Sequence, residues 1–109
     1  MHFATVGEII AKRRLYIIGH DKAAEEIILV LGKPQQFPDS GDYYCPYQIT
    51  GLGSQKVKYG AGIDAFQAIQ LTIEKIAIDL WSLNKELQGR LRWEGDEHGD
   101  LGFPPPTKV

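Results

Sequence analysis

The chain has 109 residues, of which 43% are hydrophobic and 24% charged, and its formal net charge is −2. A chain of this length is expected to form one domain, residues 1–109, which buries roughly two-thirds of its unfolded surface. The slightly negative charge excludes a general attraction to nucleic acid or to anionic membranes. The single cysteine excludes an internal disulfide and a cysteine-rich zinc site.

The N-terminal residues do not have the pattern of a targeting segment. Glu8 and the basic triplet at residues 12–14 interrupt every apolar run there, whereas a signal peptide needs about 7–15 consecutive apolar residues. No window of the sequence approaches the roughly 18 uninterrupted apolar residues of a membrane span. We therefore expect a cytoplasmic protein that does not associate with membranes.

The first half of the chain has the pattern of β-strands. Residues 9–18 alternate loosely between apolar and polar, and residues 25–31 form a short apolar run of strand length. Residues 19–22, GHDK, have the composition of a turn, so we expect an antiparallel hairpin. Residues 37–42, FPDSGD, have the composition of a loop.

The segment 43-YYCPYQITGLG-53 holds the only cysteine of the chain. In an extended conformation Cys45 shares one face with Tyr47 and Ile49. A cysteine in such an apolar row is predicted to be a packed thiol and not a nucleophile. Pro46 cannot donate to a strand ladder, which predicts an edge strand or a bulge at this position.

Residues 56–63, KVKYGAGI, alternate in the manner of a half-exposed antiparallel strand. The alternation predicts that the apolar side chains of this strand point inward. The two lysines, Gly60 and Gly62 are then expected to point outward.

Residues 64–89 predict one long helix. Asp64 and Gln67 form a capping-box pair at its start, and Gly89 is expected to end it. A stripe of residues at three- and four-residue spacing is expected to face the core: Phe66, Ile69, Ile73, Ile76, Leu80, Leu83 and Leu87. Asp79 is among the polar residues expected to point away from the core.

A further short strand is expected at residues 90–93. The predicted fold is α+β, an antiparallel sheet of about four strands in a meander with one long C-terminal helix packed on one face. The core is expected within residues 9–103, with residues 104–109 as a flexible tail.

The glycines near the helix start also suggest a nucleotide loop. Gly60 and Gly62 follow a strand and open a helix, as dinucleotide-binding loops do. Asp64, however, places a carboxylate where a pyrophosphate needs bare amides, and no parallel strand follows. The favoured interpretation is that the glycines permit a bulge or a close approach of the helix, and no cofactor is expected.

Residues 94–100, EGDEHGD, form an acidic loop. A calcium loop needs glycine at its sixth position and glutamate at its twelfth, and counted from Asp96 these positions hold Leu101 and Thr107. No metal site is therefore expected. A negatively charged patch for a basic partner, with Trp93 as its anchor, is the favoured alternative. The candidate partner-binding residues are Trp93, Glu94, Asp96, Glu97, His98 and Asp100.

Three segments resemble a family of small bacterial proteins of unknown function. They are CPYQITGLG at residues 45–53, DAFQAIQL at 64–71 and GDLGFP at 99–104, and the likeness extends over about residues 11–105. The resemblance implies a shared single-domain fold and a bacterial source. It implies no activity.

No catalytic triad, paired carboxylates or zinc spacing can be assembled from the sequence, so no catalytic residue is expected and an enzyme is not favoured. The leading hypothesis is a non-catalytic protein-binding module, in the form of an immunity protein that neutralises a basic toxin domain. The alternative is a small-ligand-binding protein or enzyme with a pocket between sheet and helix. The walls of that pocket are expected to be Tyr44, Tyr59, Gly60, Gly62 and Asp64. A homodimer stays open as a third arrangement.

Overall fold

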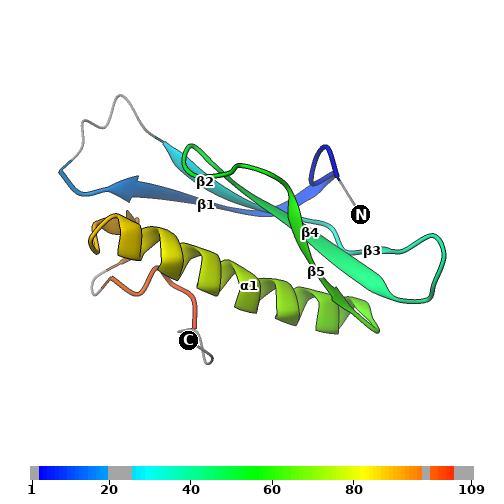
Figure 1. Cartoon of the computed structure of the whole chain (residues 1–109). Helices are drawn as coiled ribbons and strands as arrows, with labels where there is room; N and C mark the ends of the chain where they lie inside the picture. Colours follow the sequence, from blue (N-terminus) through cyan, green and yellow to red (C-terminus); the bar gives the residue numbers. More distant parts are fainter. Residues whose placement is uncertain (1–2, 20–25, 97–98, 105–109) are drawn as a thin grey trace.

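The structure, a computed structural model, describes residues 3–19, 26–96 and 99–104. The elements in these residues are β1 (Ile9–Ile17), β2 (Ile27–Gly32), β3 (Gln35–Gln36), β4 (Tyr43–Thr50), β5 (Lys58–Gly62), α1 (Ala65–Glu86) and β6 (Leu91–Trp93). Figure 1 shows the helix lying along one face of an open antiparallel sheet, so the predicted α+β class is confirmed. The predicted turn residues after Gly19 and the tail beyond Pro104 lie outside the described residues.

The sheet is a meander with additions at its edges. Strands β1, β2, β4 and β5 pair in this order, each antiparallel to the next. Strand β6 adds to the outer side of β1, and the two-residue β3 pairs with the first residues of β4. The predicted hairpin of β1 and β2 and the predicted C-terminal strand are both present. The short strand β3 was not predicted.

Strand β4 lies inside the sheet, so of the two arrangements predicted for Pro46 the edge strand is wrong, whereas the irregularity in the ladder is present. Pairing with β2 ends at Leu31 opposite Tyr47, and pairing with β3 begins at Gln35 opposite Tyr44. Between these two pairs, the three residues 32–34 lie opposite the two residues 45–46 of β4. This mismatch interrupts the ladder beside Pro46. The sheet accommodates the missing N–H because the neighbouring strand is broken there.

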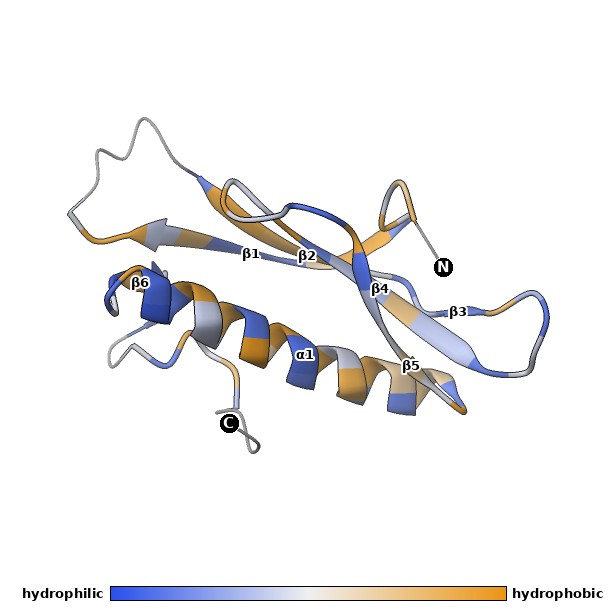
Figure 2. Ribbon diagram, in the orientation of Figure 1, coloured by the Kyte–Doolittle hydropathy of each residue, from blue (hydrophilic) through white to orange (hydrophobic). Residues whose placement is uncertain are grey.

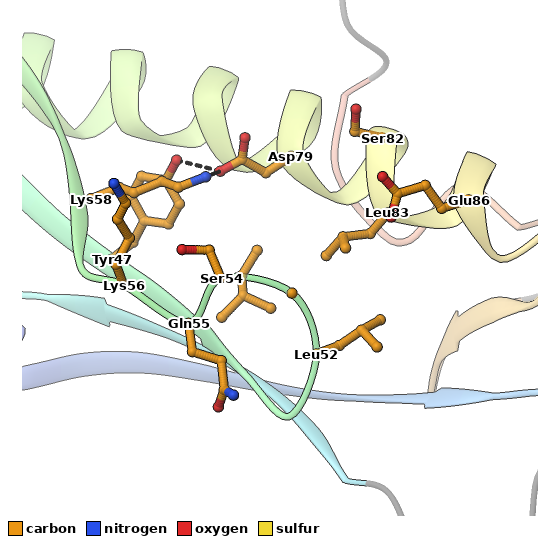
Figure 3. A pocket seen from close by; sticks show the side chains of 12 residues that line it. Tyr47, Leu52, Ser54, Gln55, Lys56, Lys58, Asp79, Ser82, Leu83 and Glu86 are labelled. Carbon is orange, nitrogen blue, oxygen red and sulfur yellow. Dashed lines mark hydrogen bonds and ion pairs between the residues drawn. The ribbon is translucent and has the colours of Figure 1, made fainter.

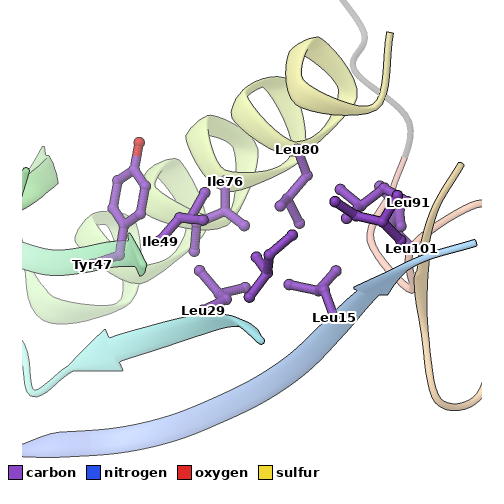
Figure 4. Packing of buried hydrophobic residues seen from close by; sticks show 10 residues of the cluster. Leu15, Leu29, Tyr47, Ile49, Ile76, Leu80, Leu91 and Leu101 are labelled. Carbon is purple, nitrogen blue, oxygen red and sulfur yellow. The ribbon is translucent and has the colours of Figure 1, made fainter. Parts of the chain in front are cut away.

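One hydrophobic core fills the space between the sheet and α1 (Figure 4). Its buried members come from every layer of the fold: Leu15, Ile17, Ile27, Leu29, Tyr47, Ile49, Ile76, Leu80, Leu91 and Leu101. Leu101 belongs to the segment after β6, so the C-terminal residues complete the core. Burial of this apolar surface is the main favourable term in folding.

The ends of α1 follow the predicted capping chemistry. The Asp64 carboxylate accepts a hydrogen bond from the Gln67 N–H at 2.8 Å. The Gln67 side chain reaches back and accepts from the Ile63 N–H at 2.7 Å, one residue before the usual capping-box partner. The chain leaves the helix through Gly89, whose φ of +79° favours glycine.

The predicted stripe of α1 is confirmed for Ile76, Leu80, Leu83 and Leu87, which are buried in the core or pack against it, but its first member lies outside the buried face. Phe66 is 80% exposed, while the small residues Ala68 and Thr72 are fully buried. A Cβ on Gly60 would lie 2.7 Å from the Thr72 nitrogen, and one on Gly62 would lie 2.6 Å from the Ala68 nitrogen. Both glycines thus face the helix, contrary to the predicted outward orientation. The close helix approach suggested for them is confirmed, and it brings the small face of α1 onto the sheet.

The N-terminal segment covers part of the opposite sheet face. Val6 is buried, and the Glu8 carbonyl accepts a hydrogen bond from the Lys33 N–H at 2.8 Å. Among the described residues of β1, Lys12, Arg14 and Tyr16 on this face are exposed, as residues on one face of an antiparallel sheet often are. Helix α1, the helix in the described part of the chain, lacks the length and apolar character that crossing a membrane requires.

Candidate functional site

The residues predicted to wall one ligand pocket lie on opposite faces of the sheet. Tyr44 and Tyr59 pack with Phe3, whose ring centroid lies 4.7 Å from that of Tyr44 and 5.3 Å from that of Tyr59. Gly60 and Gly62 face α1 on the other side, where their lack of a side chain admits the helix. Asp64 caps the helix. The five residues therefore do not form one pocket, because neighbouring strand positions alternate between faces.

Cys45 is a packed thiol, as predicted. It is fully buried, and its Sγ donates to the Gly32 carbonyl at 3.4 Å. Burial raises the pKa of this thiol. The hydrogen bond with Thr72 lowers the pKa, but by less than burial raises it. The nucleophilic thiolate is thus disfavoured.

A different pocket does lie between sheet and helix (Figure 3). It has a volume of about 240 Å³ and opens between α1 and the connection from β4 to β5. Its walls combine apolar and charged residues, among them Tyr47, Ile49, Leu52, Lys56, Lys58, Asp79, Leu83 and Glu86. No local pattern in the sequence predicts that these residues line one pocket.

A short polar network closes one end of this pocket. The Tyr47 hydroxyl donates to Asp79 Oδ2 at 2.6 Å, and Lys58 Nζ lies 3.0 Å from the same oxygen. Burial raises the pKa of Tyr47 far above its usual value, and the hydrogen bond and charge of Asp79 raise it further. Tyr47 is therefore a neutral donor and cannot serve as a base near neutral pH. Asp79 points toward the sheet, contrary to the sequence prediction.

A second feature is the outer edge of β1. This strand pairs with β2 from Ile9 to Leu15, but with β6 only from Leu15 to Ile17. Residues 9–14 therefore present an edge that no strand of the described residues covers. Ile9 and Ile10 on this edge are 52% and 49% exposed.

An apolar cleft of about 190 Å³ opens beside that edge, on the helix side of the sheet. Its walls come from β1, β2, α1 and the C-terminal segment, and include Ala11, Lys12, Arg13, Leu29, Leu31, Ile73, Ile76 and Phe103. The cleft exists because α1 lies mainly over β4 and β5, leaving the start of β1 and the end of β2 less covered.

Trp93 is half-buried and packs against Arg13 and the C-terminal segment, and its role as a partner anchor stays a prediction. The Arg13 guanidinium lies 4.0 Å from the Trp93 ring centroid and 4.8 Å from that of Phe103. Arg13 also donates to the Leu101 carbonyl at 3.0 Å. A Cβ on Gly102 would lie 2.8 Å from Trp93. The C-terminal segment thus packs tightly on Arg13 and Trp93.

Two carboxylates of the acidic loop accept hydrogen bonds from backbone N–H groups of the same segment. The Asp96 carboxylate accepts from the Gly99 N–H, and the Asp100 carboxylate accepts from the Gly102 N–H at 2.9 Å. Glu94 and Asp100 are exposed, whereas the predicted partner-binding residues Glu97 and His98 lie outside the described residues. Within residues 3–19, 26–96 and 99–104, no three metal-ligating side chains gather.

A family model described as "Domain of unknown function (DUF6968)" matches residues 11–105. The chain belongs to this family. The match agrees with the resemblance seen in the sequence and runs from within β1 to the C-terminal segment. No curated protein and no solved structure matches the chain. Membership in the DUF6968 family brings no activity, so the function has to be argued from the geometry.

Proposed function

We propose that this protein is a non-catalytic protein-binding module that receives an extended segment of its partner along the outer edge of β1. The uncovered edge at residues 9–14, beside an apolar cleft, is the observation that supports this proposal. An open edge offers backbone N–H and C=O groups to which a peptide can add as a further strand. Pockets beside the edge then select its alternate side chains.

The hydrogen bonds between β1 and β6 show which backbone N–H groups of β1 point outward. The Ile18 N–H donates to the Arg90 carbonyl at 2.9 Å, toward β6. Because backbone groups alternate in direction along a strand, the N–H groups of Lys12 and Arg14 point to the same outer side. These two amides are the donors proposed to meet the partner strand.

The side chains along the edge favour a partner segment that is both apolar and acidic. Ile9 and Ile10 supply exposed apolar surface, and Lys12 supplies exposed positive charge, whereas Arg14 is paired with Glu26 at 3.0 Å. A second copy of β1 is a poorer partner, because antiparallel pairing of two such edges would bring the basic triplets at residues 12–14 together. Like charges that face each other across strands are destabilising.

The partner can be captured from the native cell lysate by a photo-reactive amino acid placed at Ile10. The same group at Glu74, which lies exposed on α1, is the matched control. A protein captured from Ile10 and not from Glu74 is the expected result. Equal capture from both positions, or none from Ile10, would contradict the proposed edge.

The binding geometry is tested by Lys12→Pro against Lys12→Ala. Both variants lose the positive charge, but only proline also loses the outward N–H, and neither breaks a bond to β2. We expect Lys12→Pro to bind the captured partner at least about tenfold more weakly than Lys12→Ala. Thermal unfolding should show both variants folded. Equal affinities of two folded variants would exclude strand addition at this edge.

A toxin-neutralising role is the narrower form of this proposal, and the acidic loop supports it. Glu94 and Asp100 are exposed there and offer negative charge to a basic surface of the partner, separate from the acidic segment proposed to add to β1. Glu94→Lys should then weaken binding, and the loss should shrink as salt rises, because exposed charges are screened. If Glu94→Lys leaves the affinity unchanged at low salt, the loop does not contact the partner.

A further inference from the structure

We infer that the pocket between α1 and the connection from β4 to β5 binds a small zwitterion with an aliphatic body, of the class of a free aliphatic α-amino acid. This inference is independent of the proposed partner-binding edge, which lies on β1. It rests on the size of the pocket, on its apolar wall and on the placement of its charges.

The size of the pocket restricts its ligand. Pockets for drug-sized molecules usually have volumes of about 300–1,000 Å³, and this one has about 240 Å³. It is therefore suited to a molecule with the dimensions of a single amino acid. Its position at the junction of strand, turn and helix gives it walls from three parts of the fold, as Figure 3 shows.

One wall of the pocket is aliphatic. Ile49 belongs to β4, Leu52 to the connection after it, and Leu83 to α1. In Figure 3 the Leu52 and Leu83 side chains lie on the same side of the pocket, away from Tyr47 and Asp79. This wall suits a branched aliphatic group, because burial of each methylene contributes favourably to binding.

The opposite end of the pocket offers an acceptor for an ammonium group. Tyr47 and Lys58 both contact Oδ2 of Asp79, and no described residue donates to the second carboxylate oxygen, Oδ1. The Asp79 side chain is about a quarter exposed, so a ligand can reach it. Glu86 also lines the pocket, but in Figure 3 it lies beside Leu83, away from Asp79.

The lysines of the pocket have different roles. Lys58 is committed to Asp79 at 3.0 Å, whereas Lys56 lines the pocket, is exposed and forms no ion pair with any residue that the structure describes. Lys56 is thus the available cation for a ligand carboxylate. Two lysines and two carboxylates line the site, which disfavours a simple anion or cation and favours a ligand that carries both charges.

The first test is a titration followed by the backbone amide resonances of the full chain, with L-leucine as the probe. Its matched controls are 4-methylpentanoate, which lacks the ammonium group, and 3-methylbutylamine, which lacks the carboxylate. Leucine should shift the amides of residues 51–58 and 79–86 saturably at concentrations up to about 20 mM, which covers a millimolar Kd. Each control should bind about tenfold more weakly.

The second test assigns the charges to residues. Lys56→Gln should weaken leucine binding about fivefold or more, and the exposure of Lys56 makes a folding defect unexpected. Lys33→Gln and Glu74→Gln are exposed controls away from the pocket and should leave the affinity unchanged. The inference is overturned if leucine gives no saturable shift, if the three probes bind equally, or if Lys56→Gln binds leucine as the wild type does.

Discussion

A single hydroxyl group joins the helix to two strands of the sheet. Thr72 is fully buried on α1, where its Oγ1 donates to the Cys45 carbonyl at 3.0 Å and accepts from the Gly60 N–H at 3.0 Å. It therefore satisfies one backbone group of β4 and one of β5. Buried backbone groups without partners are costly, so this threonine has a role that an apolar residue of the same shape cannot fill.

Replacing Thr72 by valine should therefore lower the free energy of unfolding by about 2–3 kcal/mol, because two buried backbone groups lose their partner. Thr72→Ser keeps the hydroxyl and loses one methyl group, which should cost about 1 kcal/mol. Urea denaturation of both variants measures the difference. A serine variant as unstable as the valine variant would show that the methyl group matters more than the hydrogen bonds.

Tyr47 should make stability depend on alkaline pH. Its pKa is raised in the folded state by burial and by Asp79, so the neutral phenol is favoured by folding. The unfolded chain releases this proton above about pH 10, and the stability contributed by Tyr47 is then lost as the pH rises further. The contribution is fully present below that pH.

The corresponding measurement is the free energy of unfolding between pH 8 and pH 11.5, for the wild type and for Tyr47→Phe. The wild type should lose stability more steeply above about pH 10 than the variant does. Below that pH the variant should be less stable by about 1 kcal/mol, because the bond to Asp79 is missing. Parallel curves for the two proteins above pH 10 would contradict this role of Tyr47.

At the scale of elements, the approach of α1 to β5 determines which face of the helix is buried. Apolar residues occupy much of the helix circumference, and Figure 2 shows hydrophobic and hydrophilic residues in alternation along its exposed side. Leu71, Ile78 and Trp81 remain exposed. The small residues Ala68 and Thr72 are buried instead, because Gly60 and Gly62 allow backbone and helix to come close.

Gly60→Ala tests this contact. The added Cβ would lie 2.7 Å from the Thr72 nitrogen and 2.9 Å from its Cα, both backbone atoms that cannot rotate away. We expect a loss of about 2–3 kcal/mol in the free energy of unfolding. Gly41→Ala is the control, since its Cβ would lie 3.9 Å from the nearest side chain, and it should change stability by less than about 0.5 kcal/mol. Equal effects of the two changes would show that the close approach is not required.

At the scale of the whole molecule, the N-terminal and C-terminal segments cover parts of the sheet that α1 does not cover. Val6 packs on the outer face of the sheet, and Leu101 and Phe103 pack on the inner face beside α1. Arg13 connects the C-terminal segment to β1, through its contacts with Trp93, Phe103 and the Leu101 carbonyl. A planar guanidinium can stack on two rings and still donate, which an ammonium group cannot do.

Arg13→Lys should therefore destabilise the protein by about 1–2 kcal/mol. In a Trp81→Phe background, the fluorescence of Trp93 should also shift toward that of a solvated ring, because its cover is lost. Arg14→Lys is the neighbouring control: Arg14 forms an ion pair with Glu26 at 3.0 Å on the surface, where such pairs contribute little. Similar losses in both variants would argue against an anchoring role for Arg13.

The candidate pocket could not be predicted from the sequence, for a specific physical reason. Tyr47, Lys58 and Asp79 come from three elements, and their meeting depends on how α1 is rotated about its axis. The spacing of large apolar residues placed Asp79 on the outer side. The open edge of β1 was equally hidden, because it depends on how short the pairing with β6 is.

By itself the sequence determined the local features: the strands other than β3, the helix and its Asp64 cap, the exit at Gly89 and the packed thiol of Cys45. These follow from alternation, helical spacing and turn chemistry, which act over a few residues. Only the tertiary structure decided the rotation of α1, the interior position of β4, the packing of Trp93 and the location of the pocket. Each of these depends on contacts between residues far apart in the chain, where close packing overrides local preference.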